Sequence, residues 1–293
     1  MFTGTYTAIV TPFQTNGQLD TEALERLVHA QIKGGVDGLV PVGTTGESPT
    51  LSYEEHIQVI ELCVKFAAGR CKILAGTGAN STSEAIYLTK AAEEVGADGS
   101  LQVAPYYNKP TQEGLFQHFK AIAGETDLPL VLYSIPGRCG IEIAVDTIAR
   151  LAAACPNVVG IKEAGGSCDR VSQLRQALGR HFNILSGDDS LTLPFMSVGA
   201  EGVISVASNV IPREVSHMVD YFRSGRPDAA LKLHAKYYPL FKDLFIETNP
   251  IPVKAALALL GQIKEEYRLP LVRMNAKNRD TLKATLKACG VLK

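Results

Sequence analysis

The sequence predicts a (β/α)8 barrel followed by a C-terminal helical extension. Short, β-branched and nearly all apolar runs alternate with longer amphipathic stretches, as expected for strands buried on both faces by helices. This alternation implies right-handed crossovers and a parallel sheet, and eight such units are the number that closes a barrel. A doubly wound open sheet would need a G-x-G-x-x-G turn after the first strand, where the sequence reads VTPFQTNG.

Each expected strand is short and is followed by a stretch of helical period. The strands span residues 8–10, 38–42, 73–75, 101–104, 130–133, 158–162, 184–186 and 203–205. Two helix starts have the S-x-x-E capping-box spacing, Ser52 with Glu55 and Ser81 with Glu84, which satisfies free backbone N–H groups. Glycines that follow or end helices are expected to take the left-handed conformation at Gly34, Gly69, Gly96, Gly179 and Gly199.

The sequence pattern after Gly225 predicts helices only. Prolines interrupt these helices, and no linker or low-complexity tract precedes them. We therefore expect a catalytic barrel domain at residues 1–225 and a helical domain at residues 226–293 that packs on the barrel.

Composition and charge narrow the class of protein. Of 293 residues, 46% are hydrophobic and 20% charged, enough for a large core without disulfides or metals. A net charge of -1 argues against nucleic-acid or anionic-membrane partners. Six scattered cysteines show no C-x-x-C pair, which favours reduced thiols over a metal site. With no basic leader or long apolar run, we expect a soluble, cytoplasmic protein.

Barrel active sites lie at the C-terminal ends of the strands, where Lys162 is the leading candidate. It closes the apolar run VVGIK, and a desolvated lysine with a lowered pKa is a nucleophile toward carbonyl groups. The alternative is an ion pair between Lys162 and a carboxylate such as Glu163.

Other polar residues follow neighbouring strands. Thr44 and Thr45 in GTTGES would hold a small anion, a carboxylate as readily as a phosphate, unless this is a plain turn. Tyr133 could relay protons or belong to the core. Arg138 offers a forked guanidinium to a carboxylate, with a surface ion pair as the alternative. Because two adjacent loop aromatics rarely enter one core, Tyr106 or its neighbour is a candidate for a subunit contact.

The order of these motifs is specific. GTTGES, GTGANST, PYYNKPTQEG, YSIPGR, GIKEA, SGDD and GVISV follow one another, and TNPIPVK lies in the extension. Over essentially its whole length the chain resembles the dihydrodipicolinate synthase family, (β/α)8 barrels among the class I pyruvate-dependent aldolases and lyases. The resemblance implies that Lys162 forms a Schiff base with pyruvate without a separate cofactor or metal. The resulting enamine would attack L-aspartate 4-semialdehyde, in the first committed step of diaminopimelate and lysine biosynthesis.

The resemblance also implies a role for each matching residue. Thr44 and Thr45 would hold the pyruvate carboxylate, and Thr45, Tyr133 and Tyr107 would form a proton relay. Arg138 would bind the carboxylate of the semialdehyde. Two further matches would line the pyruvate pocket with their backbones: Gly187 and Ile204.

Two expectations concern assembly and regulation. In the family, the tyrosine matching Tyr107 reaches the neighbouring subunit's site, which implies a homo-oligomer, usually a tetramer of two tight dimers, with a dimer as the alternative. L-lysine inhibits many members, and Glu84 would face its ammonium group. Pro49 and Tyr53 replace the Ala and His of strongly inhibited enzymes. The matching contacts are Ser48, His56, Asn80, Glu84 and Tyr106.

Two alternative functions stay open at this level. One is a pyruvate-dependent sugar-acid lyase, of the N-acetylneuraminate lyase or keto-deoxy-sugar-acid aldolase type, against which Arg138 argues. The other is a catalytically inactive barrel, against which the intact Lys162 argues. Ser134 and Ser167 depart from the usual Asn and Asp of the family, which leaves the pocket's fine shape undetermined.

Overall fold

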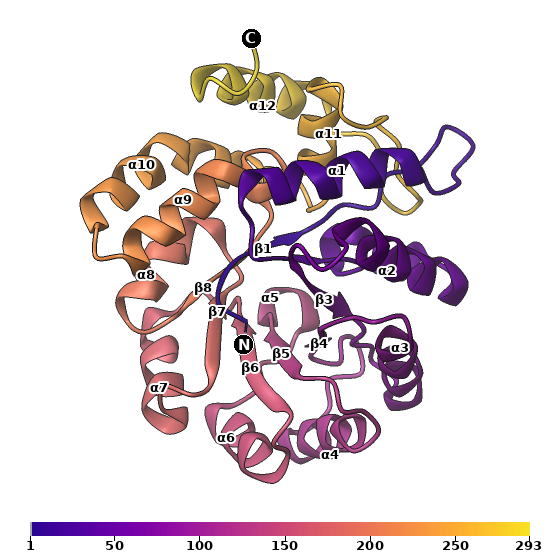
Figure 1. Ribbon diagram of the computed structural model, residues 1–293, viewed down its shortest axis with the longest axis vertical. Coiled ribbons are helices and arrows are strands. Elements are labelled where there is room, and N and C mark those ends of the chain that lie inside the picture. Colours follow the sequence, from indigo (N-terminus) through magenta and orange to yellow (C-terminus); the bar gives the residue numbers. More distant parts are fainter. Residues whose placement is uncertain (1) are drawn as a thin grey trace.

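The computed structural model, which describes residues 2–293, contains a closed barrel of eight parallel strands in chain order. Figure 1 shows the strands at the centre with helices packed around them. The predicted fold is therefore confirmed. The strands are β1 Gly4–Ala8, β2 Gly38–Val40, β3 Lys72–Gly76, β4 Gly99–Val103, β5 Leu130–Ser134, β6 Val158–Glu163, β7 Asn183–Ser186 and β8 Gly202–Ser205.

The first strand begins earlier than the sequence pattern predicts. The prediction placed it at 8–10, but the observed strand GTYTA overlaps that range only at Ala8. Its threonines are fully buried, and the Thr7 hydroxyl donates to Gln31 Oε1 at 2.7 Å. Because polar side chains are hydrogen-bonded inside the molecule, this strand lacks the apolar run by which the others were identified.

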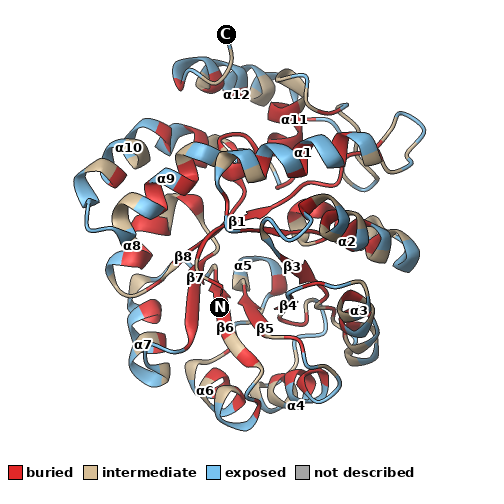
Figure 2. Ribbon diagram, viewed as in Figure 1, coloured by how far each residue is buried: buried red, intermediate tan, exposed pale blue. Residues whose placement is uncertain are grey.

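The helices cover the barrel and carry a second layer of core. Side chains inside the barrel form one apolar cluster, and a larger cluster lies between strands and helices. In Figure 2 the strands are buried, whereas the helices expose their outer faces. The helices are α1 Thr21–Gly34, α2 Tyr53–Ala67, α3 Thr82–Glu94, α4 Gln112–Ala123, α5 Pro136–Cys139, α6 Val145–Ala154, α7 Cys168–Leu178, α8 Thr192–Ser197, α9 Pro212–Arg223, α10 Pro227–Asp243, α11 Ile251–Leu259 and α12 Ala276–Ala288.

One of the two predicted capping boxes forms. Ser52 and Glu55 make both reciprocal hydrogen bonds at the start of α2. At α3 the prediction was wrong, because Ser81 makes no side-chain capping bond and its hydroxyl instead hydrogen-bonds Ser83 at 3.0 Å. A short polar side chain close to the cap can therefore compete for the capping hydroxyl.

Four of the five predicted helix-ending glycines have positive φ, and the exception is Gly34. Its neighbour Gly35 takes the left-handed conformation, with φ +83°, and ends α1. A Cβ added at Gly34 would lie 2.5 Å from the Cβ of Pro212 in α9. Gly34 is thus required for close helix packing, not for chain reversal. The four positions with positive φ are Gly69, Gly96, Gly179 and Gly199, but Gly179 has ψ -167° and so does not adopt the left-handed helical conformation.

The C-terminal extension consists of α10, α11, α12 and the segments between them. Helices α10 and α12 pack against each other, and α11 and α12 lie beyond α1 in Figure 1. The domain boundary at residue 225 stays a prediction. Among residues 2–293, no helix combines the length and apolar character that crossing a bilayer requires.

Candidate active site

A cavity of about 250 Å³ opens at the C-terminal end of the barrel. Its wall is formed by strand ends, by the loops that follow them, and by Phe245 and Asn249 from the segment between α10 and α11. This is the position at which barrel enzymes place their active sites. The polar side chains in its wall are Thr44, Thr45, Ser48, Tyr106, Tyr133, Arg138, Lys162 and Asn249.

Lys162 lies in this wall, one residue before the end of β6. It pairs in register with Tyr133 of β5, and its Nζ lies 4.2 Å from the centroid of the Tyr133 ring. The side chain is 7% exposed. Burial lowers the pKa of Lys162 from 10.5 to about 7, the nearby carboxylate of Asp189 opposes this shift, and Arg138 adds to it. A substantial fraction of the amine is therefore uncharged near neutral pH.

The alternative role for Lys162, an ion pair with Glu163, does not occur. Successive residues of a strand face opposite sides, so Glu163 points away from the barrel interior. Its carboxylate instead pairs with Arg170 Nε at 2.8 Å and accepts a hydrogen bond from Gly165 N at 2.7 Å. Lys162 has no ion-pair partner within the described residues 2–293.

Gly187, the residue after β7, provides the space that Lys162 occupies. A Cβ at this position would lie 3.0 Å from Lys162 Cε and 2.7 Å from the Cβ of Ala164. Any larger residue would therefore push the lysine side chain out of its place. Gly187 lines the cavity, and its place in a pyruvate pocket stays a prediction.

Thr44 and Thr45 lie in a 3-10 turn, Thr44–Gly46, in the wall of the same cavity as Lys162. Thr45 is buried, and its hydroxyl accepts a hydrogen bond from Asn249 Nδ2 at 3.0 Å. Thr44 lies close enough to the Tyr133 phenol to lower the pKa of that group. The pKa of the Tyr133 phenol is nevertheless raised, chiefly by burial, so the phenol is neutral and carries its proton. The two hydroxyls, the phenol and the amine thus share one cavity.

Arg138 lies on the short helix α5 at the opening of the cavity. Its Nη2 donates to the backbone oxygen of Asn249 at 3.3 Å. The alternative of a surface ion pair is not realised, since no carboxylate in the part of the chain that the structure describes lies within salt-bridge distance of Arg138. The guanidinium can therefore bind an incoming anion.

Two predicted residues lie outside this cavity in the single chain. Tyr107 is 90% exposed and has a left-handed backbone, with φ +73°. It does not line the cavity that contains Thr45 and Tyr133, so one chain alone does not assemble the predicted relay. Ile204 is fully buried in the cluster inside the barrel, and its neighbour Val206 lines the cavity instead.

The five residues predicted to bind lysine gather beside the cavity. Ser48 and Tyr106 line it, and Asn80 Nδ2 donates to the backbone oxygen of Tyr106 at 3.1 Å. His56 Nε2 hydrogen-bonds Gly76 O at 2.9 Å, and burial lowers the pKa of this histidine to about 4. The half-buried Glu84 lies near enough to Tyr106 to raise the pKa of its phenol.

Sequence reasoning missed two polar residues, Asp189 and Asn249. Asp189 is buried and accepts hydrogen bonds from Val206 N at 3.0 Å and Ala207 N at 2.9 Å. Burial raises its pKa to about 6. The position of Asp189 just after the seventh strand was a usable signal. Asn249 contacts both Thr45 and Arg138, but it belongs to the extension, and no local pattern connects it with the barrel.

Comparison with known proteins shows similarity over the full length. The sequence model of the dihydrodipicolinate synthetase family matches residues 1–289. The 4-hydroxy-tetrahydrodipicolinate synthase of a Sulfurihydrogenibium species is 55% identical over 294 residues, covering 100% of both chains.

Solved structures give the same result. The 4-hydroxy-tetrahydrodipicolinate synthase of the thermoacidophilic methanotroph Methylacidiphilum fumariolicum SolV superimposes with a TM-score of 0.98. It is 60% identical, and the match covers 99% of this chain and 96% of that one. The Cyanidioschyzon merolae enzyme with lysine bound has a TM-score of 0.97 and 44% identity, and the match covers 99% of each chain.

Proposed function

We propose that Lys162 of this chain forms the imine with pyruvate. The chain belongs to the dihydrodipicolinate synthetase family and is a 4-hydroxy-tetrahydrodipicolinate synthase, a lyase of lysine biosynthesis. The environment of Lys162 carries its assignment as the imine-forming residue. Lys162 combines burial in the cavity wall, a pKa lowered to about 7 and freedom from any ion pair within residues 2–293. A neutral, desolvated amine at this position is the form that attacks a ketone.

The chemistry proceeds through the lysine nitrogen. The neutral Nζ adds to the ketone carbon of pyruvate, and loss of water from this adduct leaves an imine. Removal of a methyl proton gives an enamine, whose carbon attacks the aldehyde of L-aspartate 4-semialdehyde and forms the new C–C bond. The amino group of the second substrate then displaces Lys162 from the imine carbon, which closes the ring and returns the free lysine.

The neighbouring groups supply binding and proton transfer. The turn that carries Thr44 and Thr45 binds the pyruvate carboxylate through hydroxyl and backbone donors. Tyr133 exchanges protons with the reacting atoms, a role supported by its position over the Lys162 amine and its retained phenol proton.

Arg138 binds the carboxylate of the semialdehyde by charge-assisted hydrogen bonds. Its place at the cavity opening and its freedom from any carboxylate of residues 2–293 support this role. The sugar-acid lyase alternative is not favoured, because the full-length relatives described above are synthases.

Assembly and regulation complete the proposal. The exposed Tyr107 enters the site of a neighbouring subunit, in a dimer or a tetramer of two dimers. L-lysine binds at the subunit interface beside Glu84 and Tyr106. The relative solved with lysine bound supports a lysine ligand, and the clustering of the five residues beside the cavity supports its position. The protein acts in the cytoplasm.

Trapping with borohydride tests the assignment of Lys162. Protein mixed with pyruvate and reduced is expected to gain one pyruvate-derived adduct, which peptide mass spectrometry places on Lys162. The adduct should be absent from Lys162→Met and present in the control variant Lys242→Met. Lys242 lies beside an adjacent hollow and not in the wall of the cavity. An adduct on another lysine, or none in the wild type, would refute the assignment.

A further inference from the structure

A buried ion pair joins the active-site loop to the C-terminal extension. Glu47 directly follows the turn Thr44–Gly46, and its Oε1 contacts the Nζ of Lys254 in α11. Both side chains have 0% exposure. The Lys254 ammonium also lies 4.4 Å from the centroid of the Phe13 ring and 5.1 Å from that of Tyr267. No established step of the reaction uses this pair.

The backbone of Glu47 is held in a conformation that its residue type disfavours. Its φ is +56°, in the left-handed region that favours glycine. Here the chain passes from one 3-10 turn into the next, and Glu47 N donates to Thr44 O at 3.2 Å. Backbone hydrogen bonds to Thr44 and Thr50 and the contact of the side chain with Lys254 together hold this conformation.

The segment of the extension from Asn249 to Lys254 contacts the loop at two places. Lys254 contacts Glu47, and Asn249, at the start of this segment, donates to the Thr45 hydroxyl at 3.0 Å. The two contacts lie on either side of Gly46, whose backbone oxygen accepts a hydrogen bond from the Thr11 hydroxyl at 2.7 Å. The loop is thus fixed at Thr45 and Glu47 by the extension, and at Gly46 by Thr11.

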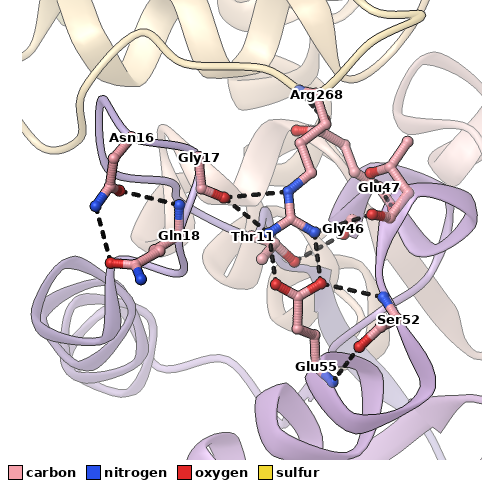
Figure 3. A network of polar contacts seen from close by, with 10 residues as sticks. Thr11, Asn16, Gly17, Gln18, Gly46, Glu47, Ser52, Glu55 and Arg268 are labelled. Atoms are coloured by element: carbon pink, nitrogen blue, oxygen red, sulfur yellow. Dashed lines mark hydrogen bonds and ion pairs between the residues drawn. The ribbon is translucent and has the colours of Figure 1, made fainter.

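A second ion pair of the extension lies next to the first but secures a different element. Figure 3 shows the guanidinium of Arg268 binding both carboxylate oxygens of Glu55 in α2 and the backbone oxygen of Gly17. Two other contacts of Arg268 reach the loop: its backbone N donates to Glu47 Oε2 at 3.3 Å, and its Nη1 donates to the backbone oxygen of Thr50 at 2.9 Å. Glu55 therefore ties the extension to α2, whereas Glu47 ties it to the active-site turn.

We propose that the Glu47–Lys254 pair is a positioning device for pyruvate, which holds the turn carrying Thr44 and Thr45 against the cavity. The proposal rests on the function proposed above for these threonines. Stability alone is a weak reason for such a pair, because desolvating two charges offsets most of their attraction and apolar pairs of similar size are often as stable. The pair offers instead a fixed geometry, with one carboxylate held by two donors of the extension.

The informative variant removes both charges together. Either single change would leave one buried charge without its partner, whereas Glu47→Gln with Lys254→Met leaves none. We expect this double variant to keep a melting temperature near that of the wild type and to have a pyruvate KM raised about tenfold. The KM for the semialdehyde should stay within about twofold. A purely structural role would lower the folded fraction, hence apparent kcat, and move neither KM.

Glu55→Gln is the matched control, because it breaks the neighbouring ion pair while Glu55 itself bonds Ser52 and Arg268 and makes no hydrogen bond to the turn Thr44–Gly46. It should lower the melting temperature and leave the pyruvate KM unchanged. If the double variant fails to fold, Lys254→Arg takes its place. It keeps the ion pair with altered geometry, and its pyruvate KM alone should rise by a few fold.

Trapping of the pyruvate adduct separates failure of this inference from failure of the proposed function. The double variant should need about tenfold more pyruvate than the wild type for half-maximal labelling of Lys162. A wild-type pyruvate KM in the folded variant, or equal rises in both KM values, would overturn the positioning role. In either case Lys162 of the wild-type protein would still be labelled. A wild-type protein without label on Lys162 would instead refute the proposed function itself.

Discussion

Lys162 and Lys254 are both buried lysines, and their surroundings give them opposite roles. Burial lowers the pKa of each ammonium group. Lys254 faces the carboxylate of Glu47, which supports its charged form, while Lys162 faces an aromatic ring and an open cavity. At the scale of the residue, a nucleophilic lysine is thus distinguished from a structural one by the absence of a tight partner.

Arg138 is expected to affect both substrates, each in a different way. For imine formation with pyruvate alone, the rate should fall at acid pH with a midpoint near pH 7, because only the neutral Lys162 amine reacts. This fall is the acid limb of the pH–rate profile. Arg138→Gln removes a positive charge that lowers the pKa of Lys162, so the pKa rises and the limb moves to higher pH. Quenched trapping with pyruvate across a pH series measures this shift.

In full turnover, Arg138→Gln should also raise the semialdehyde KM roughly 10- to 100-fold, because a charge-assisted contact worth about 1.5–3 kcal/mol is lost. Arg150→Gln is the control, because Arg150 pairs with Glu113 on the surface. A limb that stays in place, or moves to lower pH, would show that Arg138 does not act on Lys162.

At the scale of the element, adjacent glycines at the end of α1 serve two separate purposes. Gly34→Ala should destabilise the fold by roughly 1–3 kcal/mol, because its Cβ would lie 2.5 Å from that of Pro212. Gly35→Ala meets no atom within 4 Å and should cost roughly 1–2 kcal/mol through its positive φ. Denaturant unfolding of both variants measures these losses.

A second substitution separates the two causes. Combined with Pro212→Gly, the Gly34→Ala change should show a coupling of roughly 1 kcal/mol, whereas Gly35→Ala should show almost none. Equal coupling at both positions would mean that packing against α9 does not explain Gly34.

These elements also show where prediction from sequence succeeds. Seven strands and the Ser52 cap follow from local patterns that tertiary contacts leave unchanged. Local pattern cannot show that Gly34 is needed for packing, because Pro212, the residue that it approaches, lies far along the chain. Likewise β1 was misplaced because its buried threonines find hydrogen-bond partners in other elements.

At the scale of the whole molecule, the site is assembled from segments distant in sequence. Lys162, Tyr133 and the threonine turn follow from the rule that barrel sites lie at strand ends. Asn249 and Lys254 meet residues more than 200 positions away, and nothing in the extension alone indicates those contacts. The extension thus forms part of the active-site wall, which periodicity along the chain cannot predict.

The relay role proposed for Tyr107 concerns more than one copy of the chain. Its side chain is 90% exposed and outside the cavity, so the proposed relay requires another copy of the chain. Tyr107→Phe should lose most turnover while keeping pyruvate binding, because a relay acts on proton transfer more than on ground-state affinity. Steady-state kinetics with pyruvate trapping measures both quantities.

Mixed oligomers test whether this relay crosses the subunit boundary. In a dimer of one Lys162→Met chain and one Tyr107→Phe chain, exchange of tyrosines leaves one site with both defects and the other with intact Lys162 and Tyr107. Random pairing after joint refolding should therefore restore about a quarter of wild-type activity from two nearly inactive variants. If Tyr107 instead served its own chain, every site would keep one defect, and mixing would restore nothing.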